Sequence, residues 1–97
     1  LRQAGPEAEL AALRIGITFE TMGLLVYRRI APLDLVVELA GGMAVAMWRK
    51  IGPLEERIRT EQSQPSSAEW FQWLAEQCEA SKDEGMPAYI AHRGWTP

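Results

Sequence analysis

Two side chains in this sequence could act as metal ligands, general bases or nucleophiles: one histidine, His92, and one cysteine, Cys78. A transition-metal site needs three or four converging donors, and a general base needs a partner within hydrogen-bond reach. No second histidine or cysteine accompanies either residue, so His92 is expected to have a surface or capping role. Cys78 follows Leu74 on an expected helix face, which favours a small buried side chain over a reactive thiol. The sequence therefore predicts no metal, no cofactor and no catalytic residue.

Acidic pairs are the next candidates for acid–base chemistry. Glu55 adjoins Glu56, and Glu76 precedes Glu79 by one helical turn. Adjacent residues on a helix point about 100° apart. Neither pair is therefore predicted to converge in the way that two catalytic carboxylates must, and solvated helix faces are favoured.

Basic residues could instead form a patch for an anion or a lipid headgroup. Arg49 and Lys50 lie near Arg57 and Arg59 in the sequence. Mixed ion pairs are favoured over such a patch because three acids intervene, namely Glu55, Glu56 and Glu61. A nucleotide-binding loop at Gly41-Gly42 is excluded, because these glycines neither follow a strand nor precede a phosphate-binding lysine.

Tryptophan is frequent for so short a chain, with four among 97 residues. Core packing is the default explanation for Trp48, Trp70 and Trp73. The alternative is an aromatic groove or interface, because tryptophan is enriched in binding hot spots and its indole N–H needs a partner when it is buried.

The composition limits the class of protein that could carry these residues. A chain of 97 residues forms one domain with a modest core. Its 47% hydrophobic and 24% charged residues are typical of a soluble globular domain. Ten basic against thirteen acidic residues give a net charge of −3, which argues against a nucleic-acid partner. We expect one helical domain over residues 1–97, with about 1–6 and 82–97 less regular.

Helical signals dominate the first half of the chain. Gly5-Pro6 marks a helix start, and apolar residues then recur at spacings of three and four until about Tyr27 to Arg29. A second helix is expected from Pro32-Leu33-Asp34. Its segment Leu35–Trp48 is apolar nearly all round but shorter than the ~20 residues that cross a bilayer, so we predict a buried helix.

Gly41 and Gly42 interrupt this apolar segment. Each glycine costs a helix about 1 kcal/mol relative to alanine. We therefore expect the pair to mark a kink or, as the favoured reading, the closest approach between two helices.

Two further helices are expected in the second half. Gly52-Pro53 predicts a break, followed by a third helix over Pro53–Gln62 with its charged residues facing outward. Ser66-Ser67-Ala68-Glu69 matches a capping box, so Ser66 is predicted to cap a fourth helix. A short helical turn and an irregular tail should follow Met86-Pro87. The expected fold is all-α, a small bundle of about four helices.

Several short sequence words resemble one family. They are Phe19-Glu20-x-x-Gly23-Leu24-Leu25, Pro32-x-Asp34-Leu35-Val36, Trp48-x-Lys50-x-x-Pro53, Ile58-Arg59, Pro65 and Glu69-x-Phe71-x-Trp73-Leu74. Over about Ile17 to Glu76 they resemble the uncharacterised bacterial proteins grouped as domain of unknown function 4760. The resemblance implies an all-helical domain, often placed after an N-terminal membrane-anchoring helix, with no established activity and no catalytic residues. No such anchor precedes the words in this sequence, so membrane attachment is expected only through an anchor before Leu1.

These observations predict a non-enzymatic helical interaction module. A helix that is apolar all round cannot be covered fully by three flanking helices of which one is mostly polar, so we expect binding to itself or to a protein partner. A twofold dimer is the default arrangement. The predicted interface combines the apolar second helix with a tryptophan-rich surface, through Met43, Met47, Trp48, Trp70 and Trp73.

Two alternatives come from other classes of protein. The first is a membrane-tethered accessory domain whose N-terminal anchor is missing from this chain, which a stretch of ~20 apolar residues upstream would identify. The second is a small-ligand binder or enzyme, which needs convergent polar groups in a pocket. The expected location is the cytoplasm or the inner face of the membrane.

Overall fold

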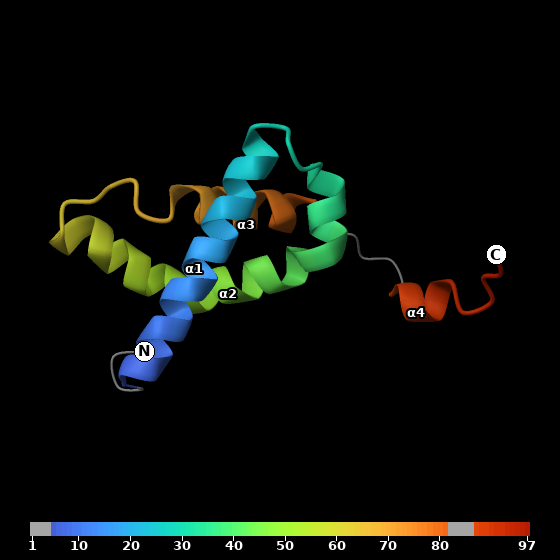
Figure 1. Cartoon of the computed structure of the whole chain (residues 1–97), viewed down its shortest axis with the longest axis horizontal. Coiled ribbons are helices and arrows are strands. Elements are labelled where there is room, and N and C mark those ends of the chain that lie inside the picture. The colour runs from blue at the N-terminus through green and yellow to red at the C-terminus, as the bar shows by residue number, and fades with distance from the viewer. Residues whose placement is uncertain (1–4, 82–86) are drawn as a thin grey trace.

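Three long helices form the body of the protein. The computed structural model describes residues 5–81 and 87–97. Helix α1 spans Pro6–Tyr27, α2 spans Leu33–Glu61, α3 spans Glu69–Ala80 and the single turn α4 spans Ala88–Ala91. No strand occurs within these ranges, so the all-α prediction is confirmed. Figure 1 shows α1 crossing α3 and the middle of α2, with α4 standing apart from the body.

Helix α1 begins and ends where the sequence predicts. Pro6 lies in the first turn, where its missing N–H is not needed, and Glu7 and Glu9 lie near the positive end of the helix dipole. The helix ends at Tyr27, and Pro32 in an extended conformation precedes α2. Proline therefore positions both helix starts in this half of the chain.

The predicted break at Gly52-Pro53 is wrong, because α2 runs through Pro53 without interruption. A proline inside a helix normally costs about 3 kcal/mol, since it removes one backbone hydrogen bond. Packing on both sides offsets that cost here. Ile51 is buried in the core, and the Trp48 ring lies over Gly52, 3.3 Å from where a Cβ would stand. The expected second and third helices are therefore one element.

Helix α2 is curved rather than straight. Figure 1 shows its strongest change of direction in the green first half of the helix, the half that contains Gly41 and Gly42, and not in the yellow-green half that contains Pro53. This placement agrees with the kink that the glycine pair predicts.

The core lies where α3 packs between α1 and α2. Phe71 and Leu74 of α3 are completely buried. The Phe71 ring stacks on Phe19 of α1 at 5.1 Å and meets Trp48 of α2 edge-on, also at 5.1 Å between ring centroids. Helices α1 and α2 touch each other much less than either touches α3. The short helix α3 therefore joins the two long ones.

The closest helix–helix approach among the described glycines is at Gly23, not at Gly41 and Gly42. A Cβ on Gly23 would stand 2.8 Å from the carbonyl carbon of Trp70 and would overlap its oxygen. A Cβ on Gly42 would meet no atom within 4 Å, and one on Gly41 would make ordinary contacts. The prediction that the pair marks the closest approach is therefore wrong: Gly42 has open space, and the buried Gly41 makes only an ordinary contact with Cys78 of α3.

The start of α3 also differs from the predicted capping box. The residue before the helix is Ala68, in the left-handed region at φ 56°, and no side chain caps the helix from within this segment. The Ser66 carbonyl, not its hydroxyl, accepts a bond from the Glu69 N–H at 3.2 Å. The left-handed residue turns the chain before the helix begins and leaves Ser66 in the preceding turn.

This arrangement assigns different roles to the two serines. The Ser67 hydroxyl donates to Glu55 Oε2 at 2.7 Å, whereas Ser66 is exposed. We expect Ser67→Ala to lower the free energy of unfolding by about 1 kcal/mol, the usual contribution of one such bond. Ser66→Ala should change it by less than about 0.5 kcal/mol, as at other surface positions. Urea denaturation midpoints measure both changes in stability. Equal losses in the two variants would mean that Ser66 does cap the helix, as the capping box predicts.

Candidate functional site

The five residues predicted for an interface do not share one exposed surface. Met43 is exposed on α2. Met47, Trp48 and Trp73 are partly buried and pack against the core, and Trp70 is half-buried. Core packing, the default explanation for the tryptophans, therefore holds for Trp48 and Trp73.

Trp70 and Trp73 also belong to an aromatic cluster with Tyr27 at the end of α1. The Trp70 ring lies 4.5 Å from Tyr27 and 6.0 Å from Trp73, and the Trp73 ring meets Tyr27 edge-on at 5.8 Å. Such contacts each add about 0.5–1.5 kcal/mol beyond the buried area. The cluster fastens the C-terminal end of α1 to the N-terminal half of α3.

The largest exposed apolar feature of α2 is a ridge formed by Leu35, Leu39 and Met43. These side chains are 49%, 76% and 62% exposed and follow one another at intervals of four residues. Their spacing places them on one face of the helix. This face of the expected buried helix Leu35–Trp48 is therefore left uncovered by the other helices of the chain, in line with the expectation that they cannot cover it fully.

Sequence reasoning missed Leu35 and Leu39, although a signal for them exists. The face of α2 that packs on the core carries Val36, Ala44 and Ile51, which follow one another at intervals of about two helical turns. The ridge residues are spaced by four among themselves but fall outside this register. The register of the core positions, rather than polarity, therefore indicates which face is buried.

A groove of about 430 Å³ lies beside this ridge, between α2 and the last turn of α3. Val37, Gly41 and Val45 of α2 line it together with Cys78 of α3. Charged residues of the lining are Glu38, Arg49 and Glu79, of which the last two pair at 3.3 Å. The groove is therefore apolar with an acidic edge at Glu38.

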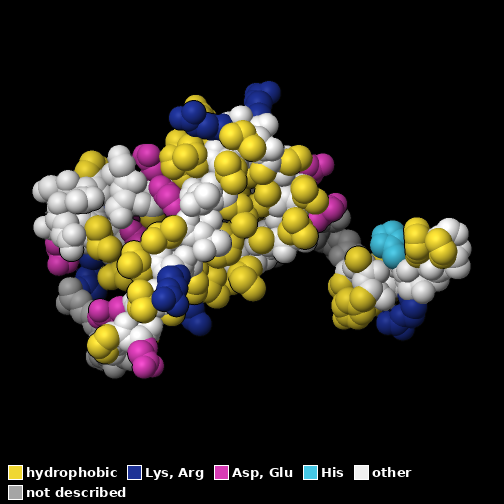
Figure 2. Space-filling view, viewed as in Figure 1, with side chains coloured by type: hydrophobic (Ala, Val, Ile, Leu, Met, Phe, Trp, Pro, Cys, Tyr) yellow, Lys and Arg dark blue, Asp and Glu magenta, His cyan; other side chains and the backbone are white. Residues whose placement is uncertain are grey.

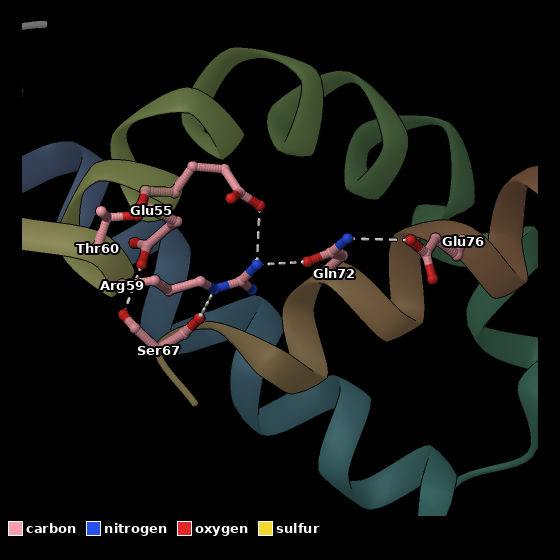
Figure 3. Close-up of polar contacts among 7 residues, drawn as sticks. Glu55, Arg59, Thr60, Ser67, Gln72 and Glu76 are labelled. Carbon is pink, nitrogen blue, oxygen red and sulfur yellow. Dashed lines mark hydrogen bonds and ion pairs between the residues drawn. The ribbon is translucent and has the colours of Figure 1, made fainter. Parts of the chain in front are cut away.

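The polar residues of the body converge on Arg59, as Figure 3 shows. The Arg59 side chain is only 17% exposed. It donates to the Ser67 carbonyl at 2.8 Å and to Gln72 Oε1 at 2.7 Å, and its guanidinium lies 5.7 Å from the Trp48 ring centroid. Glu56 completes the ion pair at 3.0 Å.

This Arg59 cluster joins two elements of the fold. It ties the turn before α3 to α2. The prediction that Arg59 faces outward is wrong, because the guanidinium group donates to the Ser67 carbonyl and to Gln72 at the same time. The prediction of mixed ion pairs is confirmed for Arg57, which pairs with Glu61 at 3.6 Å, and for Arg59.

Glu20 of α1 is the polar group that sequence reasoning overlooked. Its carboxylate accepts the Phe71 N–H at 2.8 Å, in the first turn of α3 where backbone N–H groups lack partners within the helix. Burial raises the pKa of Glu20, while its backbone hydrogen bonds from Phe71 and Trp70 act in the opposite direction. Glu20 therefore caps α3 from a different helix.

The two residues first considered for chemistry remain separate. Cys78 is buried, and burial raises the pKa of its thiol. His92 lies exposed after α4. Among residues 5–81 and 87–97, no three His, Cys, Asp or Glu side chains come together in a way that could hold a metal ion.

Helix α1 presents a second exposed apolar row, which sequence reasoning also missed. Leu10, Leu13 and Ile17 are exposed, and Figure 2 shows apolar side chains spread over this face of the molecule. By length and composition α1 could cross a membrane, with a mean hydropathy of 1.4 over 18 residues of which 22% are buried. A core helix of a soluble protein has the same length and composition.

Comparison with known sequences identifies the family. No curated protein and no solved structure matches the chain. The model of the family described as Domain of unknown function (DUF4760) matches residues 3–78. Four residues of the short motifs that resemble the family make contacts between α3, with the turn before it, and the two long helices. They are Glu20, Gly23, Arg59 and Phe71, and their contacts hold the fold together rather than belonging to the exposed ridge. With most of its length matched, the chain belongs to the DUF4760 family.

Proposed function

We propose that this chain is a non-enzymatic protein–protein interaction module whose partner is a second copy of itself. The observation that carries the proposal is the exposed ridge of Leu35, Leu39 and Met43 on α2. Burying one such side chain is worth about 1.5–3 kcal/mol. A twofold interface buries the ridges of both copies. The free energy gained by burying all of these side chains is enough to offset the entropy lost on association when packing is good.

The shape of α2 suits pairing with another α2. Residues spaced by four form a continuous ridge, and the ridges of two helices interdigitate in the commonest helix packing. In an antiparallel pair centred on Leu39, Leu35 of one copy lies opposite Met43 of the other. A twofold axis at Leu39 therefore covers all three ridge residues of both copies.

Substitution of the ridge tests the proposal directly. Leu39→Glu should raise the dissociation constant of the dimer at least 100-fold, because it buries a charge at the centre of the interface. The matched control is Leu13→Glu on α1, where the side chain is 60% exposed but lies outside the ridge. Sedimentation velocity from micromolar to millimolar concentration measures both variants. A wild-type protein that remains monomeric over this range contradicts the proposal.

A second candidate function is association with a membrane surface through α1. The supporting observation is the apolar window of α1 together with its exposed row at Leu10, Leu13 and Ile17. Glu20 argues for surface binding over insertion, since its carboxylate is engaged with α3. The domain would then act at the inner face of the membrane, and otherwise in the cytoplasm.

The same two variants separate the candidates. Cosedimentation with vesicles of zwitterionic and anionic phospholipid should be lost in Leu13→Glu and kept in Leu39→Glu if α1 binds lipid. Dimerisation should show the reverse pattern. Wild-type protein that stays in the supernatant at every vesicle concentration rules out the membrane candidate.

A further inference from the structure

The C-terminal arm, residues 87–97, is an apolar segment that makes no helix–helix contact with the described body. Figure 1 shows it standing away from the three long helices. Tyr89 and Trp95 of the arm are 72% and 73% exposed, and Ile90 is also exposed. Large aromatic side chains left in water indicate a segment that binds something.

The arm is ordered locally even though it stands alone. The Ile90 and Ala91 N–H groups both donate to the Pro87 carbonyl at 2.9 Å, and the Trp95 N–H donates to the His92 carbonyl at 3.0 Å. These bonds give two successive turns, which limits the entropy lost when the arm binds. Its charge is basic, because residues 87–97 include Arg93 and no acidic residue.

The groove between α2 and α3 has the matching properties. Its floor is apolar, at Val37, Gly41, Val45 and Cys78, and its volume of about 430 Å³ has room for an indole ring. Glu38 provides an acidic edge. Gly42 leaves the entrance open, because no atom lies within 4 Å of where its Cβ would be.

We propose that the arm of one copy binds in this groove of a second copy, with Trp95 on the apolar floor and Arg93 beside Glu38. The groove adjoins the α2 ridge, so the inference rests on the proposed self-association and extends the same interface. Because α4 makes no contact with the three long helices of its own chain, the arm is available to a second copy. A twofold axis fills both grooves at once.

Disulfide trapping tests the exchange. Both chains carry Cys78→Ala, which removes the native thiol. One chain also carries Gly42→Cys in the groove, and the second, which a tag makes heavier, carries Gly94→Cys beside Trp95. Both glycines have open space for a side chain. Mixing and mild oxidation should give a covalent dimer of mixed mass, at a yield at least tenfold above that of the control. The matched control replaces Gly42→Cys by Gly16→Cys, because Gly16 also has open space but lies on α1.

The other outcomes overturn the exchange. A chain that carries both Gly42→Cys and Gly94→Cys and forms its disulfide at monomer mass, independently of concentration, shows that the arm folds back on its own body. Equal yields with Gly42→Cys and Gly16→Cys show that the arm has no preferred site. Sedimentation of the same samples separates the two proposals. A dimer that does not form the specific disulfide contradicts the binding of the arm but agrees with self-association through the ridge, and a monomer contradicts both.

A variant of the arm provides an independent measurement. Trp95→Ala should raise the dissociation constant of the dimer about tenfold, because buried tryptophans are frequent hot spots. Tyr27→Ala is the matched aromatic control, since Tyr27 packs on Trp70 within its own chain. A dimer whose dissociation constant is unchanged by Trp95→Ala contradicts the proposal.

Discussion

Gly23→Ala is expected to lower the free energy of unfolding by about 2–3 kcal/mol, the upper part of the range of about 1–3 kcal/mol for overpacked cores. The added methyl group would overlap the Trp70 carbonyl, which is backbone and cannot rotate away. Helix α1 would have to move off α3 and loosen the contact between Phe19 and Phe71. The gain in helix propensity, about 1 kcal/mol, is too small to compensate. Thermal and urea denaturation measure the loss.

Gly42→Ala is the matched control for this substitution. Gly42 is also in a helix, but its Cβ position is open. Alanine there should raise the free energy of unfolding by about 0.4–1 kcal/mol by restricting the unfolded chain. Stabilisation by both substitutions would show that α1 and α3 do not approach each other as closely as described.

Glu20→Ala should lower the free energy of unfolding by about 2 kcal/mol, within the range for leaving a buried donor without a partner. The Phe71 N–H would lose its acceptor, and Phe71 is completely buried. Residues nearby offer no replacement, because no side chain within the segment caps α3. Amide hydrogen exchange should show the loss first at Phe71. Unchanged protection at that amide would contradict the cap.

Glu20→Gln separates the hydrogen bond from the charge. The amide oxygen still accepts a bond, so the loss should be smaller than with alanine. Burial raises the pKa of Glu20 above its usual value of 4.5, so the folded state holds this proton more tightly than the unfolded state. The proton-linked contribution of Glu20 to folding stability is therefore fully present below pH 4.5 and is lost as the pH rises through the raised pKa, whereas the hydrogen bond from the Phe71 N–H is kept at higher pH. Denaturation at several pH values should show wild type gaining on Glu20→Gln as the pH falls from 7.

The local signals of the sequence predict the elements well where packing does not oppose them. Pro6 and Pro32 mark the starts of α1 and α2, and the apolar periodicity gives the extent of α1. Pro53 fails as a signal because the burial of Ile51 in the core holds the helix together. Burial against other helices is not visible in a local pattern.

The exposed surface of α2 is harder to predict for a related reason. The sequence indicates correctly that α2 is too apolar to be covered, and Met43 is among the exposed residues. It does not indicate which face remains open, so Trp48 and Met47 were assigned to the surface although they pack inward. The Glu20 cap joins residues 51 positions apart, and no spacing rule relates such a pair.

The dependence of α3 on α1 has a consequence for synthesis of the chain. Phe71 is added 51 residues after Glu20. At translation rates of about 5–20 residues per second, roughly 3–10 s pass between the two. During this interval the face of α1 that will hold α3, including Phe19 and Gly23, is uncovered on the emerging chain. Of the three long helices, α1 is thus made first, and the helix that encloses its core face, α3, is made last.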